Sequence, residues 1–118
     1  MRILFVESDR DLRIFFGTKL KDEFNGTIDI ASTGKDAMKL LKTERPYHVI
    51  IADYNLSKGT GVDLFRFKIR NQIHGSFIFF GFTKEAFYCS TENYLQVDKP
   101  NFGLLCQRIR EALSSRFL

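Results

Sequence analysis

The sequence predicts an α/β protein in which helices cover both faces of a parallel sheet. Short β-branched and aromatic runs recur along the chain, and amphipathic helical patterns separate them. Both faces of these runs are apolar, which is typical of strands inside a parallel sheet. The connecting turns are short. We therefore expect one domain over residues 1–118, a doubly wound (βα)₅ unit whose five parallel strands follow the order 2-1-3-4-5.

The individual elements follow from runs and turn signals along the chain. Five buried strands are predicted at residues 2–6, 27–31, 49–52, 76–80 and 94–97. Three helices are expected to begin at hydroxyl-x-x-Asp patterns with the spacing of a capping box, which are Ser8–Asp11, Thr33–Asp36 and Thr60–Asp63. The third helical pattern extends to Ile73, and His74-Gly75 ends it. Asn101 is expected to cap the last helix, and residues 83–91 predict one or two helical turns.

Acidic and basic residues follow three strands that should end at the same edge of the sheet. Asp53 follows the central strand, Glu7 follows the first, and Lys99 follows the fifth. In an open α/β sheet this edge is where ligands bind. Carboxylate oxygens are ligands that Mg²⁺ prefers, a lysine can pair with a phosphoryl group, and an aspartate can carry one. The pattern indicates reception of a phosphoryl group on Asp53, whereas an aspartate that only caps a turn is the simpler alternative.

From RILFVESD through VIIADYNLSKGTG to DKP, the chain resembles the receiver domains of two-component response regulators, the CheY-like proteins of flavodoxin-like fold. The resemblance implies that Asp53 is the phosphoacceptor and that Lys99 senses the phosphoryl group. It implies that Glu7 is the first of two acids at the end of strand 1, and that the backbone carbonyl of Asn55 ligates Mg²⁺. It also implies a histidine kinase or phosphotransfer protein as donor, a downstream protein target, and a signalling domain rather than an enzyme.

Three positions depart from the family pattern. Ser8 replaces the second acid of strand 1, so we expect Mg²⁺ to bind weakly. Gly81 stands where the family has a Thr or Ser that contacts the phosphoryl group, and Thr83 is a weak substitute two residues later. Gln96 stands three residues before Lys99, where the family tends to carry a switching aromatic. The usual switching contact is therefore in doubt.

Two interpretations stay open at this stage. In the first, Asp53 takes a phosphoryl group and the domain relays the signal through protein contacts. In the second, the domain is a degenerate receiver that acts by partner binding alone. In either case the short segment with Phe87 and Tyr88 is the candidate contact site for a partner or a second copy, because aromatic side chains are enriched at interfaces.

Composition argues against several other classes of protein. The chain is 44% hydrophobic with 13 Phe and 27% charged, which predicts a soluble globular protein, and no apolar run approaches the ~20 residues of a membrane span. The net charge of +4 is dispersed, and no helix-turn-helix pattern occurs, so we expect no direct nucleic-acid binding. The acids of ESDRD would repel phosphate, which argues against a mononucleotide enzyme. Cys89 and Cys106 are expected to be reduced thiols in a cytoplasmic protein.

Overall fold

A computed structural model describes residues 1–43, 46–81, 94–99 and 101–115 of the chain. Its sheet contains five parallel strands in the order β2-β1-β3-β4-β5, which confirms the predicted topology. The strands are β1 (Arg2–Val6), β2 (Thr27–Ala31), β3 (Val49–Ala52), β4 (Ser76–Gly81) and β5 (Leu95–Asp98). The described helices are α1 (Arg10–Glu23), α2 (Gly34–Leu41), α3 (Gly61–Arg70) and α4 (Phe102–Ser115).

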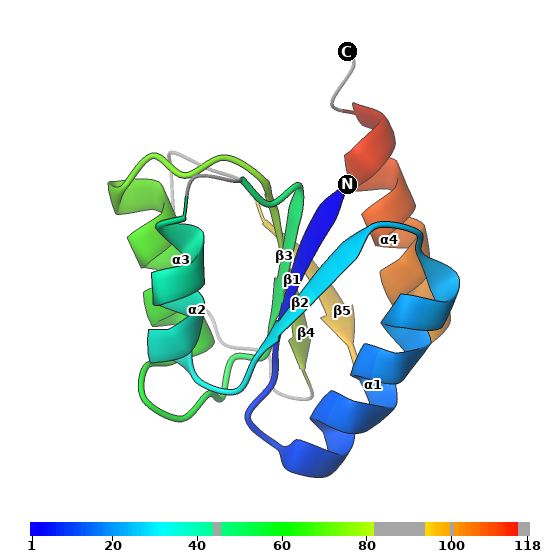
Figure 1. Cartoon of the computed structure of the whole chain (residues 1–118), viewed down its shortest axis with the longest axis horizontal. Helices are drawn as coiled ribbons and strands as arrows, with labels where there is room; N and C mark the ends of the chain where they lie inside the picture. Colours follow the sequence, from blue (N-terminus) through cyan, green and yellow to red (C-terminus); the bar gives the residue numbers. More distant parts are fainter. Residues whose placement is uncertain (44–45, 82–93, 100, 116–118) are drawn as a thin grey trace.

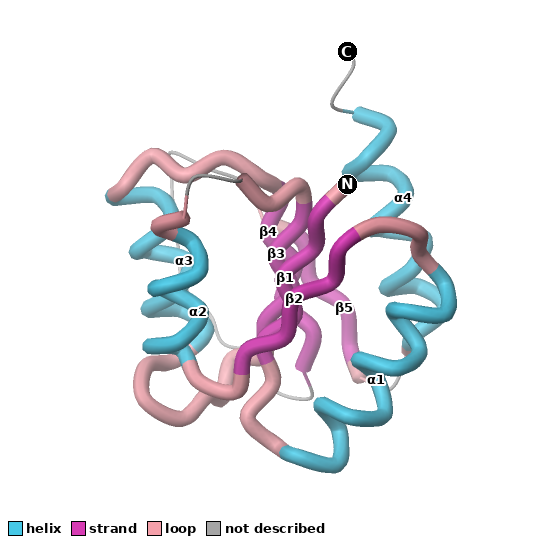
Figure 2. Tube along the Cα trace, in the orientation of Figure 1, coloured by secondary structure: helices cyan, strands magenta, loops and turns pink. Residues whose placement is uncertain are grey.

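The sheet lies between two layers of helices. Helices α1 and α4 cover one face, and α2 and α3 cover the other (Figure 1), so that the strands form the middle layer (Figure 2). Side chains alternate between the two layers: Ile3 and Phe5 of β1 pack in the core beside α1 and α4, whereas Leu4 and Val6 pack in the core beside α2 and α3. Every residue of β3 is fully buried, as a central strand of a doubly wound sheet requires.

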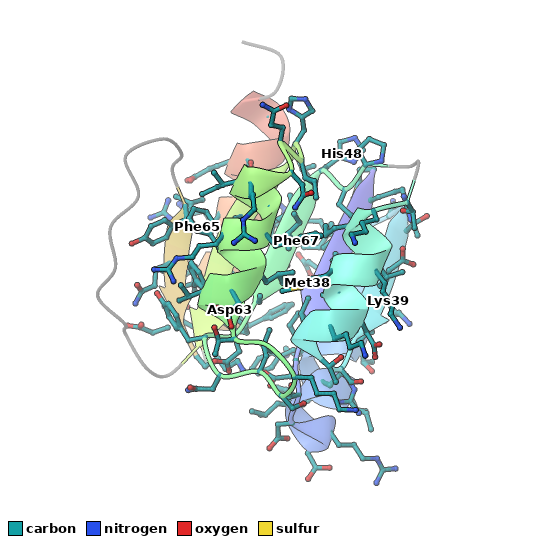
Figure 3. The ribbon with its side chains drawn as sticks, turned by 90° about the vertical axis from the view of Figure 1, so that its left-hand side faces the viewer. Met38, Lys39, His48, Asp63, Phe65 and Phe67 are labelled. Atoms are coloured by element: carbon teal, nitrogen blue, oxygen red, sulfur yellow. The ribbon has the colours of Figure 1, made fainter. Side chains whose placement is uncertain are left out.

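On the second face, α2 and α3 lie side by side, and both cover the strands (Figure 3). Met38 of α2 and Phe67 of α3 are partly buried against the same core cluster. Asp63 marks the start of α3, at the edge where the strands end, and His48 marks the opposite edge (Figure 3). These two edges carry most of the polar side chains discussed below.

Two of the three predicted hydroxyl caps are confirmed. Thr33 accepts a hydrogen bond from the backbone N–H of Asp36 at the start of α2. Thr60 and Asp63 form a complete capping box at the start of α3, with side-chain to backbone distances of 3.1 Å in both directions. The side chain of Asn101 accepts a backbone hydrogen bond at the start of α4, as predicted.

The prediction for the start of α1 is wrong by one residue. Asp9, rather than Ser8, is the N-cap, and its carboxylate accepts from the backbone N–H of Leu12 at 3.0 Å. The hydroxyl of Ser8 donates instead to the backbone carbonyl of Ser32 at 2.7 Å. Ser8 therefore joins the end of β1 to the segment that follows β2, and it is not available as a cap.

Other bounds also differ from the predictions, and β4 extends one residue further than predicted, to Gly81. Helix α3 ends at Arg70, because Gln72 has a φ of 53° and this left-handed conformation cannot continue a helix toward Ile73. Strand β5 is displaced by one residue, to Leu95–Asp98. The segment predicted as a short helix, with Thr83, Phe87 and Tyr88, lies outside the described residues, as does Cys89.

None of the described helices is long and apolar enough to cross a membrane.

Candidate functional site

The topology brings three charged residues together at the edge where the parallel strands end. In the register of the sheet, Val6 of β1 pairs with Ala52 of β3, so the next residues, Glu7 and Asp53, emerge side by side. Lys99 follows directly after β5, where its backbone N–H donates to the carbonyl of Gly81 at 3.3 Å. Adjacent strands thus supply the acids, and a strand two places along the sheet from β3 supplies the cation.

Lys99 forms an ion pair with each of the two acids. Its Nζ lies 2.7 Å from Oδ2 of Asp53 and also donates to Oε1 of Glu7. The three side chains are 0% (Lys99), 11% (Asp53) and 3% (Glu7) exposed, so Asp53 is the member that solvent reaches most easily. One ammonium faces two carboxylates, which leaves a formal charge of −1 in a nearly buried cluster.

The remaining carboxylate oxygens are held by backbone N–H groups. Oδ1 of Asp53 accepts from the N–H of Asn55 at 3.0 Å, and Oε2 of Glu7 accepts from the N–H of Asp9 at 3.1 Å. Every oxygen of both carboxylates therefore has a donor. These hydrogen bonds fix the orientation of both carboxylates. The sequence prediction that Glu7, Asp53 and Lys99 converge is confirmed.

Ser8 joins three loops beside this cluster. Besides donating to the Ser32 carbonyl, its Oγ accepts from the backbone N–H of Ser57 at 2.8 Å and lies 3.2 Å from the Ser57 hydroxyl. The loop after β3 is fixed further at the start of α2, where the N–H of Gly34 donates to the Ser57 carbonyl at 3.1 Å. The role of Ser57 was missed by sequence analysis, because Ser8 and Ser57 are 49 positions apart.

The donor set at this edge matches part of a magnesium site. Glu7 and Asp53 offer hard carboxylate oxygens, and the Asn55 carbonyl is the further donor that the family resemblance implies. Ser8 contributes no charge, and its hydroxyl is engaged by Ser32 and Ser57. No group of three or more His, Cys, Asp or Glu suited to a metal occurs among the described residues. The residues fit a weakly held Mg²⁺, which would compete with Lys99 for the same two carboxylates.

The position expected to carry a switching hydroxyl is closely packed. A Cβ at Gly81 would lie 2.8 Å from Oδ1 of Asp53 and 3.3 Å from Cδ2 of Tyr54. The Tyr54 ring is fully buried and stacks on Phe79, with 4.3 Å between ring centroids and 2° between ring planes. Its hydroxyl donates to Oε1 of Gln96 at 2.6 Å. Sequence analysis missed Tyr54, because a tyrosine directly after the strand-ending acid carries no periodic signal.

A second polar cluster lies at the opposite edge of the sheet. The guanidinium of Arg2 lies 2.9 Å from Oδ2 of Asp29, and the Tyr47 hydroxyl donates to the same oxygen at 2.5 Å. Burial raises the pKa of Tyr47 well above its usual range, and the hydrogen bond to Asp29 and the charge of Asp29 raise it further. A cavity of about 530 Å³ at this edge is lined by Tyr47 and His48 among others, and Glu7, Asp53 and Lys99 are not part of its lining.

Comparison with known proteins confirms the fold that the sequence predicted. No protein-family model and no curated protein matches this sequence. Among solved structures, the chain is similar to the receiver domain of the Francisella response regulator 1452, with a TM-score of 0.81, 22% identity and coverage of 98% of both chains. It is also similar to a DNA-binding response regulator of the LuxR family from Staphylococcus aureus, with a TM-score of 0.82, 20% identity and coverage of 94% and 97%.

A third similar structure is the receiver domain of the hybrid histidine kinase CckA, with a TM-score of 0.77, 18% identity and coverage of 96% and 99%. The chain therefore has the fold of response regulator receiver domains. The matches extend over nearly the whole length of the chain and of each similar domain.

Proposed function

We propose that this chain acts as a receiver domain in two-component signalling, in which Asp53 accepts a phosphoryl group and partner proteins respond to its state. The observation that carries the proposal is the position of Lys99, whose Nζ lies 2.7 Å from Oδ2 of the partly accessible Asp53. The donor would be a histidine kinase or a phosphotransfer protein, and the recipient of the signal a downstream protein. The similar structures that belong to a hybrid histidine kinase and to a DNA-binding regulator support this role.

In the proposed reaction, an oxygen of Asp53 is the nucleophile. A new O–P bond forms as the bond between phosphorus and the leaving group of the donor breaks, and an aspartyl phosphate results. Lys99 holds Oδ2 of Asp53 in place beforehand and pairs with a phosphoryl oxygen afterwards. The N–H of Asn55 orients Asp53 through its Oδ1. A Mg²⁺ ion, when bound, neutralises charge on the transferring phosphoryl group.

The proposal is tested by incubating the protein with Mg²⁺ and a small phosphodonor and measuring the intact mass. We expect wild type to gain the mass of one phosphoryl group and Asp53→Asn to gain none. Asp29→Asn is the matched control, because it removes a carboxylate at the opposite edge and should leave the gain unchanged. A wild-type mass that does not change under these conditions would contradict phosphoryl acceptance.

A second candidate function is a degenerate receiver that acts by partner binding alone. Two observations favour it: Ser8 replaces an acid and is engaged by Ser32 and Ser57, and Gly81 offers no hydroxyl to a phosphoryl group. In that case the wild-type mass stays unchanged, and Asp53→Asn binds partners as wild type does. Wild type and Asp53→Asn therefore distinguish the two functions, because only a phosphoryl acceptor gives a mass gain in wild type that is absent in Asp53→Asn.

A further inference from the structure

We propose that Tyr54 and Gly81 form a matched pair that holds the ends of β3, β4 and β5 in one arrangement, so that events at Asp53 remain local. The proposal assigns to Tyr54 a role as a positioning residue that acts through packing and one hydrogen bond. It goes beyond the proposed function, because it holds whether Asp53 takes a phosphoryl group or a partner binds there.

The first observation is the packing of the Tyr54 ring. The ring has 0% exposure and lies parallel to Phe79 of β4. Phe79 in turn packs against Phe65 of α3, with 5.9 Å between ring centroids, and edge-on against Tyr94, at 5.4 Å. Tyr54 is thus one member of a continuous aromatic cluster. Moving its ring would expose a large apolar surface and break the stacking.

The second observation is the hydrogen bond that crosses the sheet. In the register of the strands, Ala52 of β3 pairs with Phe79 of β4, and Phe79 pairs with Gln96 of β5. Tyr54 follows Ala52 by two residues, lays its ring over Phe79, and donates its hydroxyl to Gln96 at 2.6 Å. One side chain therefore links three neighbouring strands. A buried hydroxyl that lost this acceptor would need another partner.

The third observation is the lack of room beside Gly81. A Cβ at this position would meet Cδ2 of Tyr54 at 3.3 Å and Oδ1 of Asp53 at 2.8 Å. Gly81 is not among the glycines with a positive φ, so space rather than backbone conformation favours glycine here. The Asp53 carboxylate and the Tyr54 ring together border the space that a side chain at position 81 would need. A side chain at 81 therefore requires both groups to shift, and a smaller residue at 54 removes one of these two contacts.

These contacts limit how far a structural change can spread from Asp53 when it carries a phosphoryl group. A ligand shifts an equilibrium only if it contacts two states differently. Among the described residues, β4 ends at Gly81, which has no side chain to offer Asp53, and the side chain of β5 at position 96 is held by Tyr54. A phosphoryl group on Asp53 would therefore change its immediate surroundings and leave β5 in place.

The pairing is tested by a double-mutant cycle of Gly81→Ala and Tyr54→Val, measured by urea unfolding. We expect Gly81→Ala to raise the unfolding equilibrium constant when residue 54 is tyrosine. When residue 54 is valine, the increase caused by Gly81→Ala should be smaller by on the order of tenfold. Gly103→Ala is the control, because its Cβ would meet nothing within 4 Å and its effect should be independent of residue 54. Additive effects of Gly81→Ala and Tyr54→Val would overturn the pairing.

A milder variant keeps the test valid if the double mutant does not fold. Tyr54→Phe retains the ring and removes only the hydroxyl. We expect faster amide hydrogen exchange at Gln96 and Val97 in this variant than in wild type, with no change at Ile28 in β2 at the far edge of the sheet. Unchanged exchange at both β5 positions would show that the hydrogen bond does not hold this strand.

The consequence for signalling is tested by NMR with beryllofluoride, a phosphoryl analogue. In wild type we expect shift changes around Asp53 and Lys99 and none at Gln96 and Val97, whereas in Tyr54→Val the changes should extend into β5. Changes in β5 of wild type would overturn the proposal. If beryllofluoride does not bind at all, the proposed phosphoryl acceptance fails, and the double-mutant cycle still decides the pairing of Tyr54 with Gly81.

Discussion

The two edges of the sheet carry polar clusters of similar composition that are built in different ways. At the edge where the strands begin, Arg2 pairs with the carboxylate of Asp29 among the described residues, and the two side chains are 20% and 31% exposed. At the edge where the strands end, Lys99 faces two carboxylates, and none of the three side chains is more than 11% exposed. The first pair is partly accessible to water, whereas the second cluster, within the described part of the chain, is nearly buried and holds two carboxylates for one ammonium.

This difference indicates that only the second cluster is suited to a reaction. An ion pair that is partly accessible to water contributes little to stability. The buried cluster places an oxygen of Asp53 beside the ammonium of Lys99, an arrangement that suits the phosphoryl acceptance proposed for Asp53. Neighbouring loops hold this arrangement through Ser8 and Ser57. Removing the cation at each edge tests whether the two clusters differ in this way.

The largest effect is expected for Lys99→Met. This change leaves the carboxylates of Glu7 and Asp53 buried together without a cation, which should cost about 3–5 kcal/mol in the free energy of unfolding at neutral pH. The matched change at the other edge, Arg2→Met, should cost about 1 kcal/mol or less, because its partner is accessible to water. Urea unfolding of both variants measures the difference.

A further substitution separates charge from packing in this experiment. Adding Asp53→Asn to Lys99→Met removes one of the two repelling carboxylates and should recover part of the lost stability. Equal costs for Lys99→Met and Arg2→Met, or no recovery in the double mutant, would mean that the two edges are not different in the way described.

A smaller effect is expected for Tyr47→Phe at the edge where the strands begin. The loss of the hydrogen bond to Asp29 should cost about 1 kcal/mol at pH 7. The pKa of Tyr47 is raised in the folded state above its ordinary value of 10.0, chiefly by burial, so the folded protein binds this proton more tightly than the unfolded chain. This contribution is complete below about pH 10 and is lost as pH rises further, because the unfolded chain releases the proton first.

The measurement for Tyr47 is the free energy of unfolding of wild type and Tyr47→Phe over a range of alkaline pH. The two curves should converge above about pH 10 as wild type loses the contribution of Tyr47. Parallel curves would contradict the assignment of this pH dependence to Tyr47.

The fold was predictable because its signals are local, and part of the site was not because its contacts are long-range. The runs at β1, β3 and β4, and the caps Thr33 and Thr60, act within a few residues, so strand order and helix starts followed from them. Glu7, Asp53 and Lys99 could be placed together because parallel strands end at one edge.

The contacts of Ser8 and Tyr54 could not be predicted in the same way. Ser8 has the spacing of a helix cap, but its hydroxyl contacts Ser32 and Ser57 on other loops. Tyr54 follows the central strand in a segment with turn residues, which indicates exposure, and only the three-strand register places its ring over Phe79 and its hydroxyl at Gln96. Both residues depend on which loops and strands become neighbours, and no local pattern encodes that.

The most direct test of the central claim is to locate the modified residue after incubation with Mg²⁺ and a small phosphodonor. Borohydride reduction converts an aspartyl phosphate into homoserine, and peptide mass spectrometry then identifies its position. We predict homoserine at position 53 in wild type, and none at this position in Lys99→Ala, in which the ammonium beside Oδ2 is absent. Modification at another acidic residue, or an unmodified position 53 in the folded wild-type protein, would contradict the assignment of Asp53 as the acceptor.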